Sequence, residues 1–196
     1  SVAYPDMVVQ DLTVPASTEA GTAFTVTWTD FNQGNANAVS SSGSYYYDLV
    51  ELLDPNGQVI NSWAPYFYPD GAIEAGTGEA RSFNVSIPSN RGDGEFRVRV
   101  TTDIYGQIRE PGLENNNTST SQPITVRQVD LQTVAVSTNV SSVTMGGSLT
   151  VAWEVRNTGS ADSNNVGWYD RVQLIDPATG AEAWGAYTYL VPSLAA

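Results

Sequence analysis

Large apolar residues alternate with polar ones along several short stretches of the chain. In residues 24–29 an apolar side chain occupies every second position, and residues 83–87 and 96–101 repeat this pattern. A period of two places alternate side chains on opposite faces of a β-strand. Further strands are expected at residues 7–14, 45–53, 58–66 and 121–126. About seven short strands in roughly 120 residues predict an all-β fold, a two-sheet immunoglobulin-like antiparallel sandwich.

Two turn sequences separate these strands. Residues 55–57 (Pro-Asn-Gly) favour a tight turn and predict a hairpin between the strands on either side. Residues 90–94 (Asn-Arg-Gly-Asp-Gly) predict a second turn, which we expect at the tip of another hairpin. This turn contains the Arg-Gly-Asp tripeptide that integrins bind in animal matrix proteins. Ordinary turn chemistry explains these residues, and we assign them no binding function.

The first part of the chain recurs in the second part, in the same order and at nearly constant spacing. The matched segments are 24–28 with 149–153, 32–34 with 157–159, 46–48 with 168–170, and 52–55 with 174–177. The first pair ends in Trp28 and Trp153, and the second pair shares an Asn-x-Gly sequence. So many matches in order indicate two copies of one structural unit.

The two copies differ in length. Residues 1–127 are expected to form a complete immunoglobulin-like sandwich, whereas residues 128–196 contain equivalents of only its first four strands. Half a sandwich would leave an apolar face and open strand edges in water. Two explanations are open: the rest of the second domain lies outside the given sequence, or another subunit donates the missing strands, as in donor-strand filaments.

The composition excludes several kinds of chemistry. The 196 residues carry a formal net charge of −13 and include no His, Cys or Lys. Serine–histidine and cysteine–histidine catalysis, Schiff-base lysines, zinc sites built on His or Cys, and disulfides therefore cannot form. The acidic residues are scattered, which argues against the paired carboxylates of a glycosidase. We predict that the protein is not an enzyme.

Charge and hydropathy also limit the partners. Only eight cations stand against 21 acidic residues, so the chain is poorly suited to neutralise phosphates and we expect no nucleic-acid partner. No apolar run approaches the roughly 20 residues of a membrane-spanning helix, so we expect no membrane insertion in this segment. A surface rich in Asn, Thr and Gly and free of Lys is typical of an exported protein.

Several segments together resemble a known family. The segments are 5–9 (Pro-Asp-Met-Val-Val), Gly21, 26–28 (Val-Thr-Trp), 32–34 (Asn-Gln-Gly) and 108–116 (Ile-Arg-Glu-Pro-Gly-Leu-Glu-Asn-Asn). This pattern resembles the CARDB domain, the cell adhesion related domain found in bacteria. Residues 168–172 also fit the Trp-x-Asp-x-Val strand of that family, whereas the first copy has Tyr46 in place of the tryptophan. The resemblance implies immunoglobulin-like sandwiches, often in tandem in bacterial or archaeal surface proteins, with no shared catalytic residues.

These observations predict a non-enzymatic, extracellular structural or adhesive protein at a cell surface or in a matrix. Tandem β-sandwich modules would act as spacers or adhesion units. The expected partners are other copies or other domains of the same surface protein, and glycans are a further candidate. Two alternatives stay open: a self-assembling filament or sheath subunit in which a neighbour completes the second sandwich, and a carbohydrate-binding module of a secreted enzyme.

One segment is rich in the oxygen ligands that calcium prefers. Asp103, Glu110, Glu114 and Asn115 lie within a short connection between two expected strands, and Asp48 is a further contributor. Calcium takes six to eight oxygen ligands from flexible loops. The spacing of an EF-hand is absent, and a solvated connection in which the Asn side chains cap the turn is the alternative. Calcium is the one candidate cofactor.

Aromatic residues form a second candidate site. Tyr45, Tyr47, Trp63, Tyr66 and Tyr68 lie close together in the sequence, and alternation along a strand points about half of such a run outward. Outward aromatic rings either stack on sugars or pack against a neighbouring domain or subunit. In addition, Asn84, Asn117 and Asn139 stand in Asn-x-Ser/Thr sequences and are candidate glycosylation sites.

Overall fold

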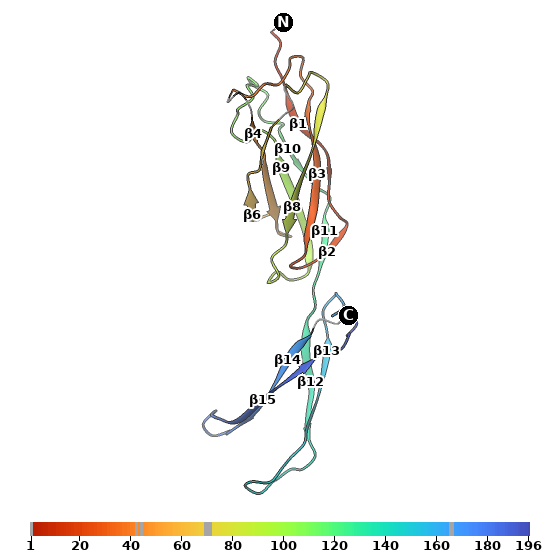
Figure 1. The fold of residues 1–196 in the computed structure, drawn as a ribbon, viewed down its shortest axis with the longest axis vertical. Helices are drawn as coiled ribbons and strands as arrows, with labels where there is room; N and C mark the ends of the chain where they lie inside the picture. Colours follow the sequence, from red (N-terminus) through yellow and green to blue (C-terminus); the bar gives the residue numbers. More distant parts are fainter. Residues whose placement is uncertain (1, 42, 44, 69–71, 165–166) are drawn as a thin grey trace. The chain divides into compact units, whose positions relative to one another are not determined.

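The computed structural model describes residues 2–41, 43, 45–68, 72–164 and 167–196. The chain divides into two compact units, Ser1–Arg127 and Gln128–Ala196 (Figure 1). Within the described residues all regular structure is β-strand, which confirms the predicted all-β fold. The strands of the first unit are β1 (Met7–Thr13), β2 (Ser17–Glu19), β3 (Ala23–Asn32), β4 (Tyr46–Tyr47), β5 (Leu49–Leu53), β6 (Val59–Trp63), β7 (Tyr66–Phe67), β8 (Gly78–Ser86), β9 (Gly94–Thr101), β10 (Thr118–Thr120) and β11 (Ile124–Arg127).

The first unit is an immunoglobulin-like sandwich of two sheets. One sheet has the strand order β1-β3-β8, and the other has the order β2-β11-β9-β5-β6, with β10 also paired to β9. Strand β2 runs parallel to β11, whereas the other strand pairs are antiparallel. Pro15 interrupts the first extended segment, so β1 joins one sheet and β2 the other. The short pair β4-β7 lies beside them.

The core between the sheets comes from the residues that alternation assigns to the inner faces. Val26 and Trp28 of β3 pack there against Phe96, Val98 and Val100 of β9. All five side chains are almost completely buried. Burying a large apolar side chain stabilises the fold by about 1.5–3 kcal/mol, so this layer supplies much of the drive to fold.

The structure confirms one predicted turn and corrects the other. Strands β5 and β6 form the expected hairpin, and Asp54 Oδ1 accepts the backbone N–H groups of Asn56 and Gln58 at 2.9 Å each. Strands β8 and β9, however, belong to different sheets, so residues 90–94 do not form a hairpin tip. This turn carries the chain from one sheet to the other. The alternation of apolar and polar residues predicts which face of each strand is buried, but it does not predict which strands pair with each other.

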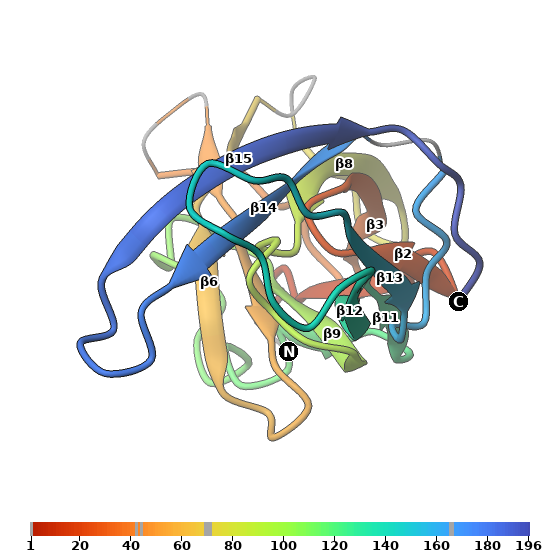
Figure 2. The same ribbon diagram turned by 90° about the horizontal axis from the view of Figure 1, so that it is seen from below.

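In the second unit, the strands of the described residues form two antiparallel ribbons. Strand β12 (Leu131–Thr138) pairs with β13 (Val151–Asn157), and β14 (Trp168–Ile175) pairs with β15 (Glu182–Leu190). Figure 2 shows β14 and β15 side by side as a long, curved ribbon.

Asn32 of the first unit and Asn157 of the second make matching hydrogen bonds. Asn32 Oδ1 accepts the N–H groups of Asp6 and Gly34, and Asn157 Oδ1 accepts those of Asp130 and Gly159, all at 3.1 Å. A Cβ atom on Gly34 would lie 2.4 Å from the backbone oxygen of Tyr4, and one on Gly159 would lie 2.2 Å from that of Gln128. Each Asn-x-Gly sequence therefore fastens the start of its unit to the end of a strand, β3 in the first unit and β13 in the second, and only glycine fits at its third position.

Candidate functional site

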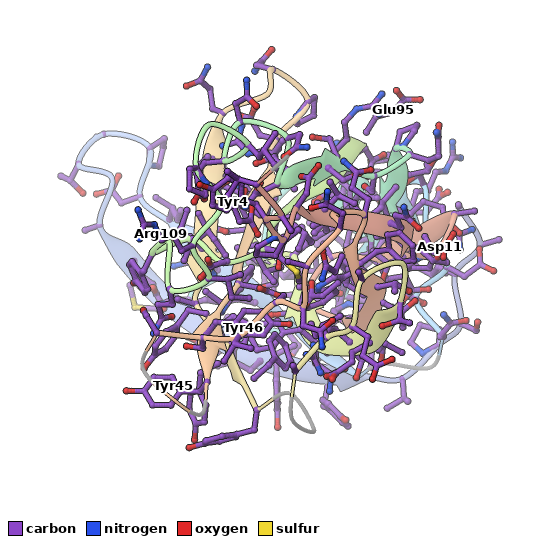
Figure 3. The ribbon with its side chains drawn as sticks, turned by 90° about the horizontal axis from the view of Figure 1, so that it is seen from above. Tyr4, Asp11, Tyr45, Tyr46, Glu95 and Arg109 are labelled. Atoms are coloured by element: carbon purple, nitrogen blue, oxygen red, sulfur yellow. The ribbon has the colours of Figure 1, made fainter. Side chains whose placement is uncertain are left out.

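Two features stand out in the first unit: a network of charged and polar side chains in the interior, and a cluster of tyrosines on the surface above it. Strand β4 connects them, because its two residues point in opposite directions. Tyr46 is fully buried, and its neighbours Tyr45 and Tyr47 are partly exposed. In Figure 3 the ring of Tyr45 lies at the edge of the unit and Tyr46 lies further inside.

The interior network starts from the indole of Trp28. Its Nε1 donates to Asp30 Oδ1 and to Asp48 Oδ2, with an N···O distance of 3.0 Å in each case, and both acidic side chains are completely buried. The Tyr46 hydroxyl donates to Asp30 Oδ2 at 2.6 Å. Buried carboxylates are costly unless they are paired and hydrogen-bonded, and these contacts meet part of that cost.

Arg81 of β8 supplies the positive charge. Its Nε donates to Asp30 Oδ2 at 2.9 Å, and its Nη2 donates to the Tyr46 hydroxyl and to Glu79 Oε2, at 2.7 Å each. The guanidinium also lies over the ring of Phe67, 4.8 Å from the ring centroid. Arg81 is thus held from several sides and joins β3, β4, β7 and β8.

The electrostatics show which groups of the network carry charge. Burial, and then the nearby charge of Asp30, raise the pKa of Asp48 well above its ordinary value, so Asp48 favours its neutral form. Burial likewise raises the pKa of the Tyr46 phenol. Burial alone would lower the pKa of Arg81, but its interactions with Tyr46 and Asp30 raise it, and Arg81 stays charged. The network is therefore centred on one buried ion pair, Asp30 with Arg81, and the partly exposed Glu79 is a second acidic partner of Arg81.

Asp103 extends the network into the connection after β9. It has a left-handed backbone, with φ of 48°, and its own N–H donates to Asp48 Oδ1 at 3.2 Å. The two carboxylate oxygens accept the backbone N–H groups of Gln107 at 2.8 Å and Ile108 at 2.7 Å. Burial is the main reason that the pKa of Asp103 rises to about 6. Asp103 therefore organises the turn that follows it.

Glu110 fastens the same connection to the first strand. It is almost completely buried, its Oε1 accepts the N–H of Met7 at 2.9 Å, and its Oε2 accepts the Asn117 side-chain amide at 3.2 Å. Burial, with a further contribution from the charge of Glu114, raises the pKa of Glu110 to about 7. Of the carboxylates that the sequence marks as calcium ligands, Asp103 and Glu110 thus accept hydrogen bonds from the protein itself.

The candidate calcium ligands divide into two pairs. Asp103 and Glu110 are buried, whereas Glu114 and Asn115 are exposed. Within the described part of the chain, no three acidic side chains are grouped so that they could hold a metal ion. Calcium at this connection stays a prediction of the sequence. The fully buried Asp48, a further candidate ligand, already accepts two N–H groups.

The calcium prediction can be tested by thermal unfolding with and without a chelator. A bound Ca²⁺ would offset the repulsion of Glu114 on Asp103 and Glu110, so millimolar Ca²⁺ should raise the unfolding temperature of the first unit. Glu114→Gln should remove the increase, whereas Glu95→Gln, on a different part of the unit, should retain it. An unfolding temperature that Ca²⁺ leaves unchanged would exclude the site.

The surface tyrosines form one continuous cluster. We define the tyrosine cluster as Tyr45, Tyr47, Tyr66, Tyr68 and Tyr105, whose rings touch one another with centroids 5.3–6.3 Å apart. The pairing of β4 with β7 places Tyr47 opposite Tyr66. Tyr66, Tyr68 and Tyr105 are 55%, 63% and 65% exposed. Four of the five predicted aromatic residues are therefore neighbours in space.

Trp63 and Tyr105 differ from the sequence-based expectation. Trp63 lies against the core, with its ring 5.9 Å from that of Phe83, and does not join the tyrosine cluster. Tyr105 joins the cluster although it is far away in sequence, and its ring lies 5.3 Å from that of Tyr47. No local sequence pattern connects Tyr105 to the others. Only the packing of the connection after β9 beside β4 brings it there.

The candidate glycosylation residues have different surroundings. Asn84 and Asn139 are exposed, and their side-chain oxygens accept hydrogen bonds from Thr25 Oγ1 at 2.9 Å and from the Thr150 backbone at 2.8 Å. Asn117 is buried, and its amide nitrogen, the atom to which a glycan would be joined, donates to Glu110. The folded first unit therefore does not present Asn117 for modification.

Comparison with models of known families shows to which family the chain belongs. The family model of CARDB matches residues 4–121, more than half of the chain. The chain belongs to the CARDB family. This family is named for a cell adhesion related domain found in bacteria, so the function of the chain is related to cell adhesion in this coarse sense. No curated protein matches the chain.

Solved structures include two of a CARDB domain from Pyrococcus furiosus. The crystal structure, in complex with di-metal ions, is 18% identical, covers 64% of this chain and 96% of its own, and has a TM-score of 0.43. The solution NMR structure is 19% identical, covers 64% of this chain and 97% of its own, and has a TM-score of 0.42. The Pseudomonas fluorescens alkylpurine DNA glycosylase, bound to DNA with an abasic site analog, is 16% identical over 62% of this chain and 30% of its own, with a TM-score of 0.36.

The described residues contain no helix that is long and apolar enough to cross a membrane.

Proposed function

We propose that the chain is a non-enzymatic extracellular module, a spacer and adhesion unit of a cell-surface or matrix assembly, whose tyrosine cluster binds another copy of the same protein. The observation that carries this proposal is the cluster itself, five touching tyrosines of which three are more than half exposed. Tyrosine rings offer a large, rigid contact area at low conformational entropy cost and are enriched in protein interfaces.

The orientation of the rings favours a protein partner over a sugar. The ring pairs of the cluster meet edge to face, with interplanar angles between 66° and 90°. Neighbouring rings therefore present a mixture of faces and edges. A flat platform for stacking along a glycan needs roughly coplanar faces, whereas an uneven aromatic surface suits the side chains of another protein.

The buried network supports this surface from below. Tyr46 follows Tyr45 and precedes Tyr47, and its hydroxyl is fixed by Asp30 and Arg81. On the neighbouring strand Phe67 lies between Tyr66 and Tyr68 and lies under the Arg81 guanidinium. Each inner residue fixes the backbone that carries two outer rings, so the tyrosine cluster is held in place before it binds. Such preorganisation lowers the entropy cost of association.

Removal of two exposed rings tests the proposal. We expect Tyr66→Ala together with Tyr68→Ala to reduce the aggregation of chain-coated beads by about tenfold, because large aromatic side chains dominate interface energies. The unfolding temperature should change little, because both rings are mainly exposed. The matched control is Tyr4→Ala, which removes an exposed tyrosine of the same unit from outside the cluster. Equal aggregation of all three forms would contradict the proposal.

The two alternatives make different predictions in the same assay. A carbohydrate-binding module would bind glycan-coated beads through the same tyrosines and would leave chain-coated beads dispersed. A filament subunit completed by its neighbour would self-associate through the second unit, and the tyrosine substitutions would leave that association intact.

A further inference from the structure

Two polar side chains in the interior of the first unit have atoms that form no hydrogen bond. Thr102 directly follows β9 and Asn117 directly precedes β10, and both residues are almost completely buried. Within the described residues, Thr102 Oγ1 and Asn117 Oδ1 have no hydrogen-bond partner. A buried polar atom without a partner destabilises the fold, so this pair calls for an explanation.

The register of β9 and β10 places these two side chains opposite each other. Thr101 pairs with Thr118, and their hydroxyl oxygens lie 2.8 Å apart on the exposed face. Thr102 and Asn117 form the next pair, in which the Thr102 N–H donates to the backbone oxygen of Asn117 at 3.0 Å. Because successive side chains alternate between faces, Thr102 and Asn117 both point inward, and the Cβ atoms of such a pair lie about 4.5–5.5 Å apart. Rotation about the side-chain bonds can therefore bring the hydroxyl to the amide carbon.

Glu110 lies at the amide group of this pair. Its Oε2 accepts a hydrogen bond from Asn117 Nδ2 at 3.2 Å, and its Oε1 accepts one from the Met7 N–H at 2.9 Å. Burial raises the pKa of Glu110 to about 7, so its neutral and charged forms both occur near neutral pH. A carboxyl group with such a pKa is suited to both donating and accepting a proton during a reaction. A hydroxyl, an amide and an acid–base group thus occupy one buried region.

We propose that Thr102 and Asn117 react with each other to form an ester bond inside the first unit. Thr102 Oγ1 attacks the side-chain carbonyl carbon of Asn117, a C–O bond forms, and the C–N bond to Nδ2 breaks. The hydroxyl proton passes to Glu110, and Glu110 gives a proton to Nδ2, which leaves as ammonia. Glu110 ends in the form in which it began, and the reaction consumes no other reagent. It takes place in the interior and needs no access from solvent.

The fold favours this reaction in two ways. The strand pairing holds the two groups close together, and well-oriented neighbours react as if they were present at very high concentration. The ester also replaces an unpaired hydroxyl and an amide by less polar oxygens, which reduces the penalty of burying them. The bond closes residues 102–117 into a covalent loop that holds the connection carrying Tyr105 and restricts the unfolded state. The inference is independent of what the tyrosine cluster binds.

Mass spectrometry of the whole chain tests this proposal. After incubation of the folded chain at neutral pH, we expect its mass to be lower than the sequence requires by one ammonia molecule. Cleavage after arginine should leave residues 100–109 joined to residues 110–127, because Arg109 lies between the two ester partners, and hydroxylamine should separate them. A chain of full mass would overturn the proposal. Loss of ammonia with the two peptides separate would also overturn it, because a succinimide formed at another asparagine loses ammonia without joining peptides.

Substitutions show which groups form the bond. Thr102→Val retains the shape of the side chain without its hydroxyl and should abolish the joined peptides, whereas Thr102→Ser should retain them. The matched control is Thr101→Val, which removes a hydroxyl from the exposed face of β9 and should leave the joined peptides unchanged. Glu110→Gln should slow their appearance by about 100-fold, because an amide cannot transfer the protons. Joined peptides in Thr102→Val would overturn the proposal; if a variant does not fold, the mass of the unsubstituted chain still decides.

Discussion

Replacing Arg81 with Leu is expected to lower the free energy of unfolding of the first unit by about 3–5 kcal/mol, because the substitution leaves the Asp30 carboxylate buried without its counter-charge. The loss is larger than that of an exposed ion pair such as Arg156 with Glu154, which contributes about 0–1 kcal/mol. The free energy can be measured from the hydrogen exchange of the most protected β3 amides, which report on the unfolding of this unit.

A triple substitution is the control for this prediction. Asp30→Val, Tyr46→Phe and Arg81→Leu together remove both charges and the hydroxyl between them, as the second unit does with Val155 and Trp168. Replacement of a whole buried ion pair by apolar residues is often close to neutral, so the triple variant should regain most of the lost stability. Arg81→Leu alone costing less than about 1 kcal/mol would show that Arg81 is not essential to the network.

Raising the pH from about 5 to 8 is expected to destabilise the first unit. The pKa of Glu110 rises from 4.5 to about 7 in the folded chain, and that of Asp103 from 3.8 to about 6. The folded state therefore holds these protons more tightly than the unfolded state does. The resulting stabilisation is complete below the ordinary pKa values and is lost as the pH rises through the folded values. Glu110 alone accounts for about 3 kcal/mol of this change.

Glu110→Gln separates this effect from general charge repulsion in an acidic chain. The Gln side-chain oxygen can still accept the Met7 N–H, and its amide group can donate to Asn117 Oδ1 if the Asn117 amide turns over. The atom Asn117 Oδ1 is buried without a hydrogen-bond partner. The variant should therefore fold and should lose most of the pH dependence of its unfolding free energy between pH 5 and 8. Unchanged pH dependence in the variant would show that Glu110 does not carry the effect.

The inner faces of the strands follow from the sequence because alternation depends on local geometry alone. The same alternation also indicates the buried network of charged side chains. Asp30 continues the inward series of Val26 and Trp28, and Arg81 continues that of Phe83 and Val85. A charged residue at an inward position indicates a buried partner, and two such residues of opposite charge indicate an ion pair. The sequence cannot show that β3 and β8 are neighbours, which is needed to pair them.

Other features depend on contacts that no sequence pattern records. Residues 45–53 alternate as one strand, but Asp48 divides them into β4 and β5, because the two parts pair with different strands. Tyr105 reaches the tyrosine cluster only through the turn that Asp103 organises. Glu110 has the composition of a calcium ligand, and its hydrogen bond to Met7 spans most of the first unit in sequence. Long-range packing determines all three.

The central claim, that the tyrosine cluster binds another copy of the protein, is tested most directly by force measurements between a chain-coated tip and a chain-coated surface. At 0.15 M salt, where the repulsion between two acidic chains is screened beyond about 8 Å, we expect frequent rupture events. Their frequency should fall strongly with Tyr66→Ala and Tyr68→Ala, and should stay unchanged with Tyr4→Ala. Rupture events that are equally frequent with all these chains, or that occur only on a glycan-coated surface, would contradict the claim.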